Sequence, residues 1–557
     1  MSELVGFFKQ RLFSFKREIA RGWHAMRHKG PSQLQFWLIA LLIGIAAGFF
    51  AIGFRVAIDF LQEQIYGASD KDLHSKLAEL HWAWVVSVPI LGGLAVGILL
   101  KLFTSDGRIQ SLANVIEGAA LREGRVDKRK GILATFIALI TLSTGGSTGR
   151  EGPVVHFGAV VSSWVSNLIH ADGITARDLM GCAAAAAVSA SFNAPIAGTI
   201  FALEVVLRHF AVHAFAPIVI ASVAGTVVSR WQMGNVTEFI LPSVNLSFYQ
   251  ELPAFLMLGL LCGFVAYLLI RSIFVAEDLG DALQKATRMP IWLRPAVAGG
   301  LLGLIAIWFP HIIGVGYETT SKALTGQIGL WLTVSYVMVK VVAVAITFAG
   351  RMGGGIFSPS LMVGALTGLS FGYVATAIAP GVSGVETLYA LAGMGAVAAA
   401  VLGAPISTTL IVFELTGDWQ AGIAVMVSVS LASALTSRLV DRSFFLTLLE
   451  RRGVHLADGP QAYLLATIST GRLMRIIGAE NGASGVQCQE LVDQGVFLTS
   501  DSNLEHAMPM FETGSSEIIP IIDADSATPE ILGALFYVDA LKAYNRALAE
   551  TAREEHS

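Results

Sequence analysis

Charged residues and cysteines are scarce in this 557-residue chain. Asp, Glu, Lys and Arg together make up 14% of it, against roughly 25% in a typical soluble domain. Three cysteines are too few for a disulfide framework. The net charge of −4 and the lack of a basic face with interleaved aromatics exclude a nucleic-acid-binding protein. Because 54% of the residues are apolar, the composition predicts a protein that crosses a membrane several times.

Motifs for nucleotide or metal chemistry are also missing. The chain has no Gly-x-x-x-x-Gly-Lys-Ser/Thr loop, and its twelve histidines show no His-Glu-x-x-His spacing. We therefore expect neither a metal nor a cofactor, and any transport by such a protein would be passive or ion-coupled rather than driven by ATP. Glu151 is a carboxylate in a region with few charges and could serve an enzyme as a general acid or base. We do not expect an enzyme, because the neighbouring residues (Thr148, Gly149, Arg150 and Gly152) include no base-activated nucleophile.

The first part of the chain is basic. Residues 1–34 hold seven Lys or Arg against two Glu, with phenylalanines between the positive charges. A solvated tail and an amphipathic helix lying on anionic headgroups are both compatible with this pattern. In either case the positive-inside rule places this segment in the cytoplasm.

Residues 35–453 carry the apolar stretches of a membrane domain. The longer ones are Gln35–Phe54, Ala83–Leu100, Phe215–Val228, Leu256–Ile270, Ile328–Phe348 and Ile423–Leu435. Others, such as Gly131–Leu142 and Ala194–Val205, are too short for a full span of about 20 residues. Broken helices of this kind are typical of transporters and channels.

The chemistry changes near residue 458, and the last 100 residues hold 15 Asp or Glu and five Lys or Arg. We interpret 454–488 as a linker and 489–557 as a small cytosolic α/β domain, so that the C-terminus is cytoplasmic. Strand-like and helical runs alternate in it in a β-α-β-β-α order. These runs are Gly495–Thr499, Leu504–Phe511, Glu517–Ile522, Leu532–Tyr537 and Val538–Leu548.

Three motifs recur in the same order with nearly constant offsets of 207, 206 and 210 residues. They are Gly92-Gly93-Leu94 with Gly299-Gly300-Leu301, Gly149–Pro153 with Gly355–Pro359, and Ala194-Pro195-Ile196 followed by Glu204 with Ala404-Pro405-Ile406 followed by Glu414. This duplication predicts two homologous halves, at about 83–240 and 290–440, with a site where they meet near the membrane midplane. A pure sensor built around the acidic tail would leave these repeats unexplained.

The two Gly-rich turns each open into an apolar stretch. Helices starting there would aim unpaired N–H groups and positive dipole ends at one point, which suits a small monovalent anion. The alternative is that the glycines only allow close helix packing. Glu151 is an ionisable residue at membrane depth. As a gate it would occupy the anion site when ionised and leave when protonated; the alternative is an ion pair with Arg150.

These residues resemble the CLC family of chloride channels and proton/chloride exchangers. The likeness rests on Gly149-Arg150-Glu151-Gly152-Pro153 and Gly355-Ile356-Phe357-Ser358-Pro359, with Phe413–Asp418 and the Ala-Pro-Ile motifs, and runs from about residue 35 to 453. It implies an all-α polytopic homodimer in a bacterial inner membrane, each subunit with a pore between two inverted halves of broken and tilted helices. The implied function is transport of chloride, and of nitrate or other small monovalent anions, in exchange for protons. The alternative is a passive chloride channel gated by voltage or pH.

The resemblance also implies roles for single residues. Glu151 would be the gating glutamate, and Arg150, Gly152, Ile356 and Phe357 would contribute to the anion site. Gln110 stands where the family has a central serine, with Ser111 one step away, and Phe445 replaces the pore tyrosine. Loss of these two hydroxyls predicts that nitrate or thiocyanate competes well with chloride.

The family's internal proton-transfer glutamate corresponds to Val205 in this chain. We therefore assign the proton pathway to Glu151 and Glu204, with a structural role at a helix end as the alternative for Glu204. The C-terminal unit resembles half of a CBS pair. That likeness implies pairing across the two-fold axis of a dimer, with a nucleotide as a candidate ligand.

Overall fold

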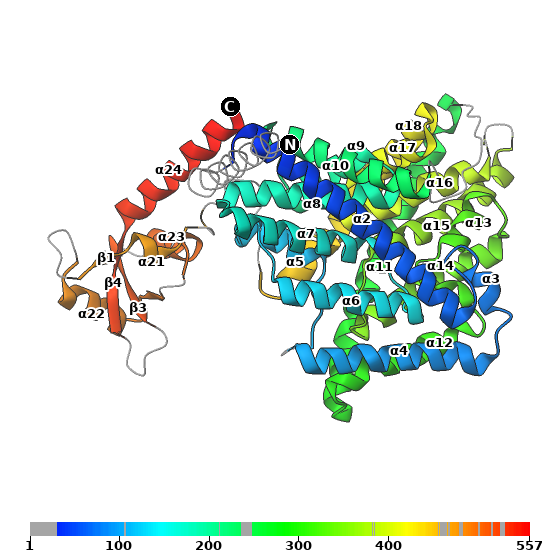
Figure 1. Cartoon of the computed structure of the whole chain (residues 1–557), viewed down its shortest axis with the longest axis horizontal. Coiled ribbons are helices and arrows are strands. Elements are labelled where there is room, and N and C mark those ends of the chain that lie inside the picture. Colours follow the sequence, from blue (N-terminus) through cyan, green and yellow to red (C-terminus); the bar gives the residue numbers. More distant parts are fainter. Residues whose placement is uncertain are drawn as a thin grey trace, which may run out of the picture. The chain divides into compact units, whose positions relative to one another are not determined.

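The computed structural model describes residues 31–556, apart from 105–106, 211, 235–247, 381–382, 384, 455, 457–464, 466–467, 478–482, 500–501, 514–515 and 524–529. The expected basic segment at 1–34 therefore lies almost wholly outside the described residues, as does much of the expected linker. The chain forms two compact units, one covering nearly all residues up to Val454 and one covering the residues from His455 onward. We call them the membrane unit and the C-terminal unit (Figure 1).

The membrane unit consists of helices, and seven helical segments within the described residues are long and apolar enough to cross a membrane. They are α2 (Gln33–Tyr66), α4 (Trp82–Phe103), α10 (Val212–Met233), α11 (Phe248–Thr287), α14 (Leu330–Ala349), α15 (Phe357–Ile378) and α18 (Trp419–Leu439), the last continuing toward α19 (Phe444–Glu450). Each of the six longer apolar stretches predicted from the sequence falls within one of these helices or begins just before it. The chain is an integral, multi-pass membrane protein.

The remaining helices pack among these spans. They are α3 (Leu73–Leu77), α5 (Leu112–Leu121), α6 (Lys128–Thr144), α7 (Glu151–Ile169), α8 (Gly173–Phe192), α9 (Pro195–Phe201), the π-helical turn η1 (Ala202–Leu207), the 3-10 turns η2 (Ile291–Leu293) and η3 (Pro310–Ile312), α12 (Arg294–Ala306), α13 (Tyr317–Leu324), α16 (Glu386–Leu402) and α17 (Pro405–Thr416). Some of them start inside the protein, as α7 does at the buried Glu151 and α15 at the buried Phe357.

The duplication seen in the sequence is present in the structure. The pairs α4/α12, α6/α14, α7/α15, α8/α16, α9/α17 and α10/α18 follow one another in the same order in the two halves. The turns before α7 and α15 pair as an antiparallel bridge between Gly149 and Gly355. Two equivalent segments that meet antiparallel are related by a two-fold axis, so the halves are inverted with respect to each other.

The repeated Gly-Gly-Leu motif has a packing role at the crossing of α4 and α12. A Cβ on Gly93 would lie 2.2 Å from the carbonyl oxygen of Pro295, and one on Gly299 would lie 2.0 Å from that of Pro89. Only glycine permits this approach, which is how membrane helices gain close van der Waals contact. The two contacts are reciprocal, because each glycine lies four residues after the proline whose carbonyl oxygen the other glycine approaches.

The C-terminal unit is a four-stranded sheet with helices. Its elements are α21 (Thr470–Leu473), β1 (Arg475–Ile476), α22 (Gly485–Asp493), β2 (Leu498–Thr499), α23 (Leu504–Thr513), β3 (Ile518–Asp523), β4 (Glu530–Phe536) and α24 (Tyr537–His556). The strand order is β1-β4-β3-β2, with β2 parallel to β3 and the other neighbours antiparallel. The predicted β-α-β-β-α order from β2 to α24 is confirmed.

The boundary at residue 489 is wrong, because the folded C-terminal unit begins earlier. Strand β1 pairs with β4 through Arg475 opposite Ala534, and Cys488 on α22 is buried against Ile518 and Ala534. A strand of two residues is too short to show an alternating pattern. The segment assigned as linker therefore supplies an edge strand and a helix of the unit.

Candidate functional site

The two Gly-rich turns bring the starts of α7 and α15 together. The Gly149 N–H donates to the Gly355 oxygen at 2.7 Å, and the Gly355 N–H donates to the Gly149 oxygen at 2.8 Å. A Cβ on Gly355 would lie 3.1 Å from the backbone nitrogen of Gly152, so a side chain there would force the turns apart. Both helices therefore direct their N-terminal amides and positive dipole ends toward one region, as the sequence predicted.

A narrow cavity lies beside these helix starts. Its volume of about 20 Å³ is enough for one water-sized group. The lining residues are Ser111, Leu112, Glu151, Gly152, Val155, Val188, Phe201, Phe348, Gly354, Gly355, Ile356, Phe357, Phe444 and Phe445. Of the predicted site residues, Ser111, Glu151, Gly152, Ile356, Phe357 and Phe445 are brought together here, whereas Gln110, Arg150 and Glu204 do not line it.

Glu151 is the first residue of α7 and is buried, with 2% of its surface exposed. Its Oε1 accepts hydrogen bonds from the Ser358 hydroxyl at 2.5 Å and from the Tyr317 hydroxyl at 3.0 Å. Both donors belong to the second half of the repeat. The carboxylate thus bridges the halves at the wall of the cavity, which is the position that a gate would occupy.

Arg150 lies next to Glu151 in the chain but outside the cavity lining. Its guanidinium carbon is 4.7 Å from the centre of the Tyr317 ring, and the side chain is buried. A cation over an aromatic face is an attractive contact. Arg150 thereby holds Tyr317 in place, and Tyr317 in turn contacts the carboxylate of Glu151.

The structure corrects the placement of Gln110. Its side-chain oxygen is 3.1 Å from Nε2 of His156, whose Nδ1 is 3.1 Å from the backbone oxygen of Ser111. Ser111 lines the cavity and Gln110 does not. The Ser111 hydroxyl is buried and has no hydrogen-bond partner among the described residues. A hydroxyl is therefore present where the sequence suggested that one was lost.

Phe445, on α19, lines the cavity. Phe444, Phe348, Phe201 and Phe357 share the lining, so aromatic rings make up much of it. Aromatic carbon, with no tyrosine hydroxyl, therefore lines the cavity around Phe445.

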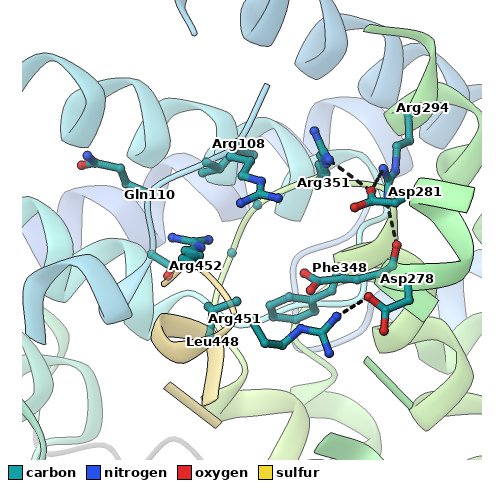
Figure 2. A pocket seen from close by; sticks show the side chains of 15 residues that line it. Arg108, Gln110, Asp278, Asp281, Arg294, Phe348, Arg351, Leu448, Arg451 and Arg452 are labelled. Carbon is teal, nitrogen blue, oxygen red and sulfur yellow. Dashed lines mark hydrogen bonds and ion pairs between the residues drawn. The ribbon is translucent and has the colours of Figure 1, made fainter. Parts of the chain in front are cut away.

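A wider space of about 310 Å³, which we call the vestibule, adjoins the cavity through Ser111, Phe348 and Gly354 (Figure 2). Its charged lining residues are Arg108, Arg294, Arg351, Arg451, Arg452, Glu277, Asp278 and Asp281. With five arginines against three carboxylates, the vestibule has a positive balance. A concave site of one sign concentrates small ions of the opposite sign.

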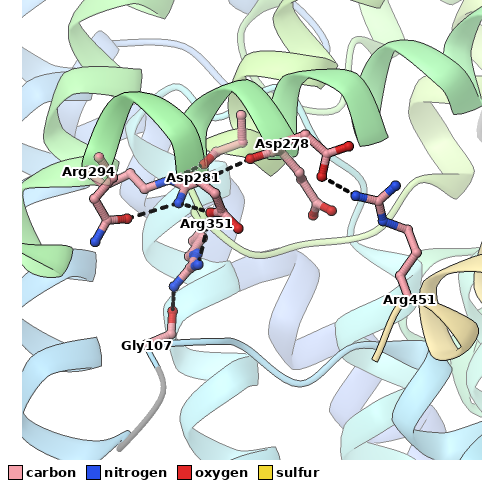
Figure 3. Close-up of polar contacts among 9 residues, drawn as sticks. Gly107, Asp278, Asp281, Arg294, Arg351 and Arg451 are labelled. Carbon is pink, nitrogen blue, oxygen red and sulfur yellow. Dashed lines mark hydrogen bonds and ion pairs between the residues drawn. The ribbon is translucent and has the colours of Figure 1, made fainter. Parts of the chain in front are cut away.

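The acidic residues of the vestibule lie on the last turns of α11 and are held by arginines (Figure 3). Asp281 is paired with Arg294 and with Arg351, the latter at 3.1 Å, and Asp278 is paired with Arg451. Arg294 also donates to the backbone oxygen of Ala349 at 2.6 Å. These pairs fasten the end of α11 to the segments that lead into α12, α15 and the C-terminal end of α19.

Glu204 lies on η1 in the first half, and its side chain caps the start of α17 in the second half. Its two carboxylate oxygens accept from the Ile406 and Ser407 N–H groups of α17 at 2.9 and 2.8 Å. Glu414 does the same in reverse, accepting from Ile196 and Ala197 of α9 at 3.0 and 2.7 Å. The third repeated motif is thus a reciprocal cap between the halves, and this geometry fits the structural alternative for Glu204.

Tyr317 and Ser358 are the functional candidates that the sequence interpretation missed. Ser358 carried a signal, since it is part of the second signature motif. Tyr317 follows Gly314 and Gly316, both at positive φ, but nothing local connects it to Glu151, which is 166 residues away.

Comparisons with known proteins agree with this architecture. Residues 92–437 match the family described as "Voltage gated chloride channel". A ClcB-like chloride channel protein of Ralstonia nicotianae is 32% identical over 395 residues, covering 70% of this chain and 91% of the relative. The H(+)/Cl(-) exchange transporter ClcA of Vibrio parahaemolyticus is 27% identical over 435 residues, covering 76% of this chain and 91% of the relative.

A solved structure gives the same result for the fold. The crystal structure of a slow cyanobacterial Cl⁻/H⁺ antiporter superimposes with a TM-score of 0.66 at 21% identity, covering 75% of this chain and 97% of that one. At this identity the likeness concerns the arrangement of helices.

Proposed function

The chain belongs to the voltage-gated chloride channel family, and we propose that it exchanges chloride for protons across a membrane with Glu151 as the gate. The family consists of channels and transporters. Chloride/proton exchange is favoured over passive conduction because relatives spanning most of this chain, such as ClcA of Vibrio parahaemolyticus, are named as exchangers.

The position of Glu151 is the observation that carries the proposal. Its carboxylate lies at the wall of the cavity between two converging helix starts. An ionised carboxylate there occupies the place of an anion, and protonation removes the charge that holds it. One side chain can in this way alternate with chloride and carry a proton.

The anion route runs from the vestibule to the cavity. The positive balance of the vestibule draws small anions in, and Ser111 with the amides of Ile356 and Phe357 receives them. Without a lysine or arginine among the cavity-lining residues, a monovalent anion can bind and still leave. Chloride is the proposed substrate, with nitrate and thiocyanate as competing anions.

The proton route is proposed to use Glu204 together with Glu151. Glu204 is half-buried, and its carboxylate caps α17. A passive chloride channel is the second candidate, because Val205 is apolar and both Glu204 oxygens accept backbone N–H groups. Proton flux distinguishes the two.

We further propose that the protein is a homodimer in a bacterial inner membrane with both termini in the cytoplasm. The C-terminal unit is proposed to be a CBS-like half-module that pairs with its copy across the two-fold axis. Its order of elements from β2 to α24 supports this, and a nucleotide is its candidate ligand.

The test is purified protein in liposomes, with chloride efflux and proton movement recorded together. We expect a chloride gradient to drive protons uphill, and we expect Glu151→Gln to keep chloride flux while proton movement falls to background. Glu79→Gln is the matched control, since Glu79 is an exposed carboxylate outside the site. Wild-type chloride flux without proton movement would establish the channel instead, and unchanged coupling in Glu151→Gln would remove Glu151 from the gate.

A further inference from the structure

A buried lysine holds the segment of backbone that leads to Tyr317. Lys340 lies in the middle of α14 with none of its surface exposed. Its ammonium donates to the backbone oxygens of Ile312 at 3.2 Å and of Gly314 at 3.4 Å. Both oxygens belong to the stretch between η3 and α13, and Tyr317 is the first residue of α13. Burial of an ammonium group is costly unless the group is paired or hydrogen-bonded, so this lysine needs an explanation.

The anchored segment has little freedom of its own. Gly314 and Gly316 have positive φ, at 70° and 89°. The Gly314 N–H donates to the Gly146 oxygen at 3.1 Å, and the Gly314 oxygen accepts from Lys340. The backbone of Gly314 is therefore fixed at both of its polar groups, three residues before Tyr317. The position of Tyr317 depends on these contacts.

Tyr317 connects this segment to the gate. Its hydroxyl donates to Oε1 of Glu151 at 3.0 Å, and the guanidinium of Arg150 lies 4.7 Å from the centre of its ring. A hydrogen bond to a carboxylate favours the ionised form over the protonated one. In the proposed function the ionised form closes the anion site. A displaced Tyr317 would therefore let the gate open more readily.

Asp70 supplies the negative charge beside the anchor. It lies in the loop between α2 and α3, is 5% exposed, and neither carboxylate oxygen has a hydrogen-bond partner among the described residues. A Cβ on Gly314 would lie 3.3 Å from its Oδ1. Burial raises the pKa of Asp70. Three cations oppose that rise in pKa and one carboxylate adds to it, namely Arg150, Lys340 and Arg55 against Asp59. A buried carboxylate of this kind is stabilised by the opposite charges around it.

We propose that Lys340 and Asp70 are positioning residues for the gate. Lys340 anchors the backbone that carries Tyr317, and Asp70 supplies the opposite charge that stabilises this buried ammonium. The inference rests on the proposed function, because it takes Glu151 as the gate. Neither Lys340 nor Asp70 lines the cavity, so both act on the gate through Tyr317.

The test is the pH dependence of chloride efflux from liposomes that hold the purified protein. Lys340→Met keeps the length of the side chain and removes the donor, so Tyr317 is held less well and the ionised gate is less favoured. The pH of half-maximal efflux should therefore rise by about one unit, which corresponds to a tenfold loss at the hydrogen bond to Glu151. Asp70→Asn should also raise it. If the charge of Asp70 instead acted directly on Glu151, its removal would lower this pH.

A double-mutant cycle distinguishes positioning from a role in stability alone. Tyr317→Phe should raise the pH of half-maximal efflux, and adding Lys340→Met to it should give no further rise, because the two residues act through one hydrogen bond. Asp72→Asn and Lys76→Met are the matched controls. Asp72 is exposed just before α3, and Lys76 is a partly exposed lysine within α3. Both controls should match wild type.

A variant that leaves one buried charge unpaired can fail to fold. The combined Lys340→Met and Asp70→Asn variant removes both charges and should show the same rise. A half-maximal pH within about 0.3 unit of wild type, a twofold effect, in that variant or in Tyr317→Phe would overturn the inference. A further full shift when Lys340→Met is added to Tyr317→Phe would do so as well. Failure of the proposed gate is a separate result, seen as wild-type efflux that does not depend on pH.

Discussion

The hydroxyl of Ser111 is buried where the cavity meets the vestibule. It lines both spaces and has no hydrogen-bond partner among the described residues. Its backbone N–H donates to the side-chain oxygen of Asn114 at 3.0 Å, and Arg452 donates to the same oxygen at 3.2 Å. These hydrogen bonds hold the loop in place, so the buried Ser111 hydroxyl is available to donate to an anion that passes from the vestibule to the cavity.

Replacement of Ser111 by alanine tests this role. Because Ser111→Ala removes a donor from a desolvated anion, chloride binding should weaken by about 1–3 kcal/mol. The loss should be smaller for weakly hydrated nitrate and thiocyanate, so their permeability relative to chloride should rise in liposome flux assays. Ser437→Ala is the control, since Ser437 is exposed on α18. Unchanged permeability ratios would show that the amides of Ile356 and Phe357 set selectivity alone.

At the same scale, the sequence predicted the residues whose motifs are long and missed those defined by distant contacts. Glu151, Ile356 and Phe357 were found because five-residue motifs fix their register. The sequence could not decide whether Gln110 or Ser111 corresponds to the family's serine. Both lie in a short loop, where an alignment shifted by one residue changes no recognisable motif. Tyr317 was not predictable, because its contact with Glu151 exists only after the two halves have come together.

At the scale of helices, the reciprocal caps join the two halves. Glu204 caps α17 and Glu414 caps α9, each through two backbone N–H groups of the other half. Carboxylates at helix N-termini are favourable because they satisfy unpaired donors and complement the dipole. A glutamine can accept only with one of its two terminal atoms, so either substitution removes part of a cap.

This equivalence makes Glu414→Gln the matched control for Glu204→Gln. Both variants should lose stability, by about 1–2 kcal/mol for a weakened cap, visible as a lower unfolding temperature of the purified protein in detergent. Only Glu204→Gln should abolish proton movement while chloride flux continues in the liposome assay. If proton movement survives in both variants, Glu204 is a structural residue and the proton route lies elsewhere.

The spans themselves were predictable, while their full lengths were not. Apolar stretches such as Leu256–Ile270 lie inside the longer helix α11, which continues to Thr287 through Glu277, Asp278 and Asp281. Hydropathy registers only the part suited to hydrocarbon. The charged end is stabilised by pairs with Arg294, Arg351 and Arg451 from distant segments, and these contacts leave no local signal.

At the scale of the whole molecule, the chain divides into units stabilised in different ways. In the membrane unit, glycine-mediated helix crossings and caps between the halves hold the pieces together. The C-terminal unit has an apolar core around Leu504, Ile519, Ile521 and Leu535, as a small water-soluble domain does. Its edge strand β1 is held to α24 by an ion pair in which Arg475 donates from Nε at 2.7 Å and from Nη2 at 3.0 Å to the two carboxylate oxygens of Asp539.

Because of that ion pair, the stability of the C-terminal unit should decrease as the pH falls. The hydrogen bonds from Arg475 hold the pKa of Asp539 below its usual value, so the pair stabilises the unit above the unfolded-state pKa of about 4. This contribution is lost as the pH falls through the lower, folded-state value. Asp539→Asn should therefore be cleaved faster than wild type when the full-length protein is digested briefly with protease at pH 7, with new termini in the C-terminal unit. Glu490→Gln, at an exposed carboxylate of α22, should match wild type, and equal cleavage of all three proteins would mean that the pair does not anchor β1.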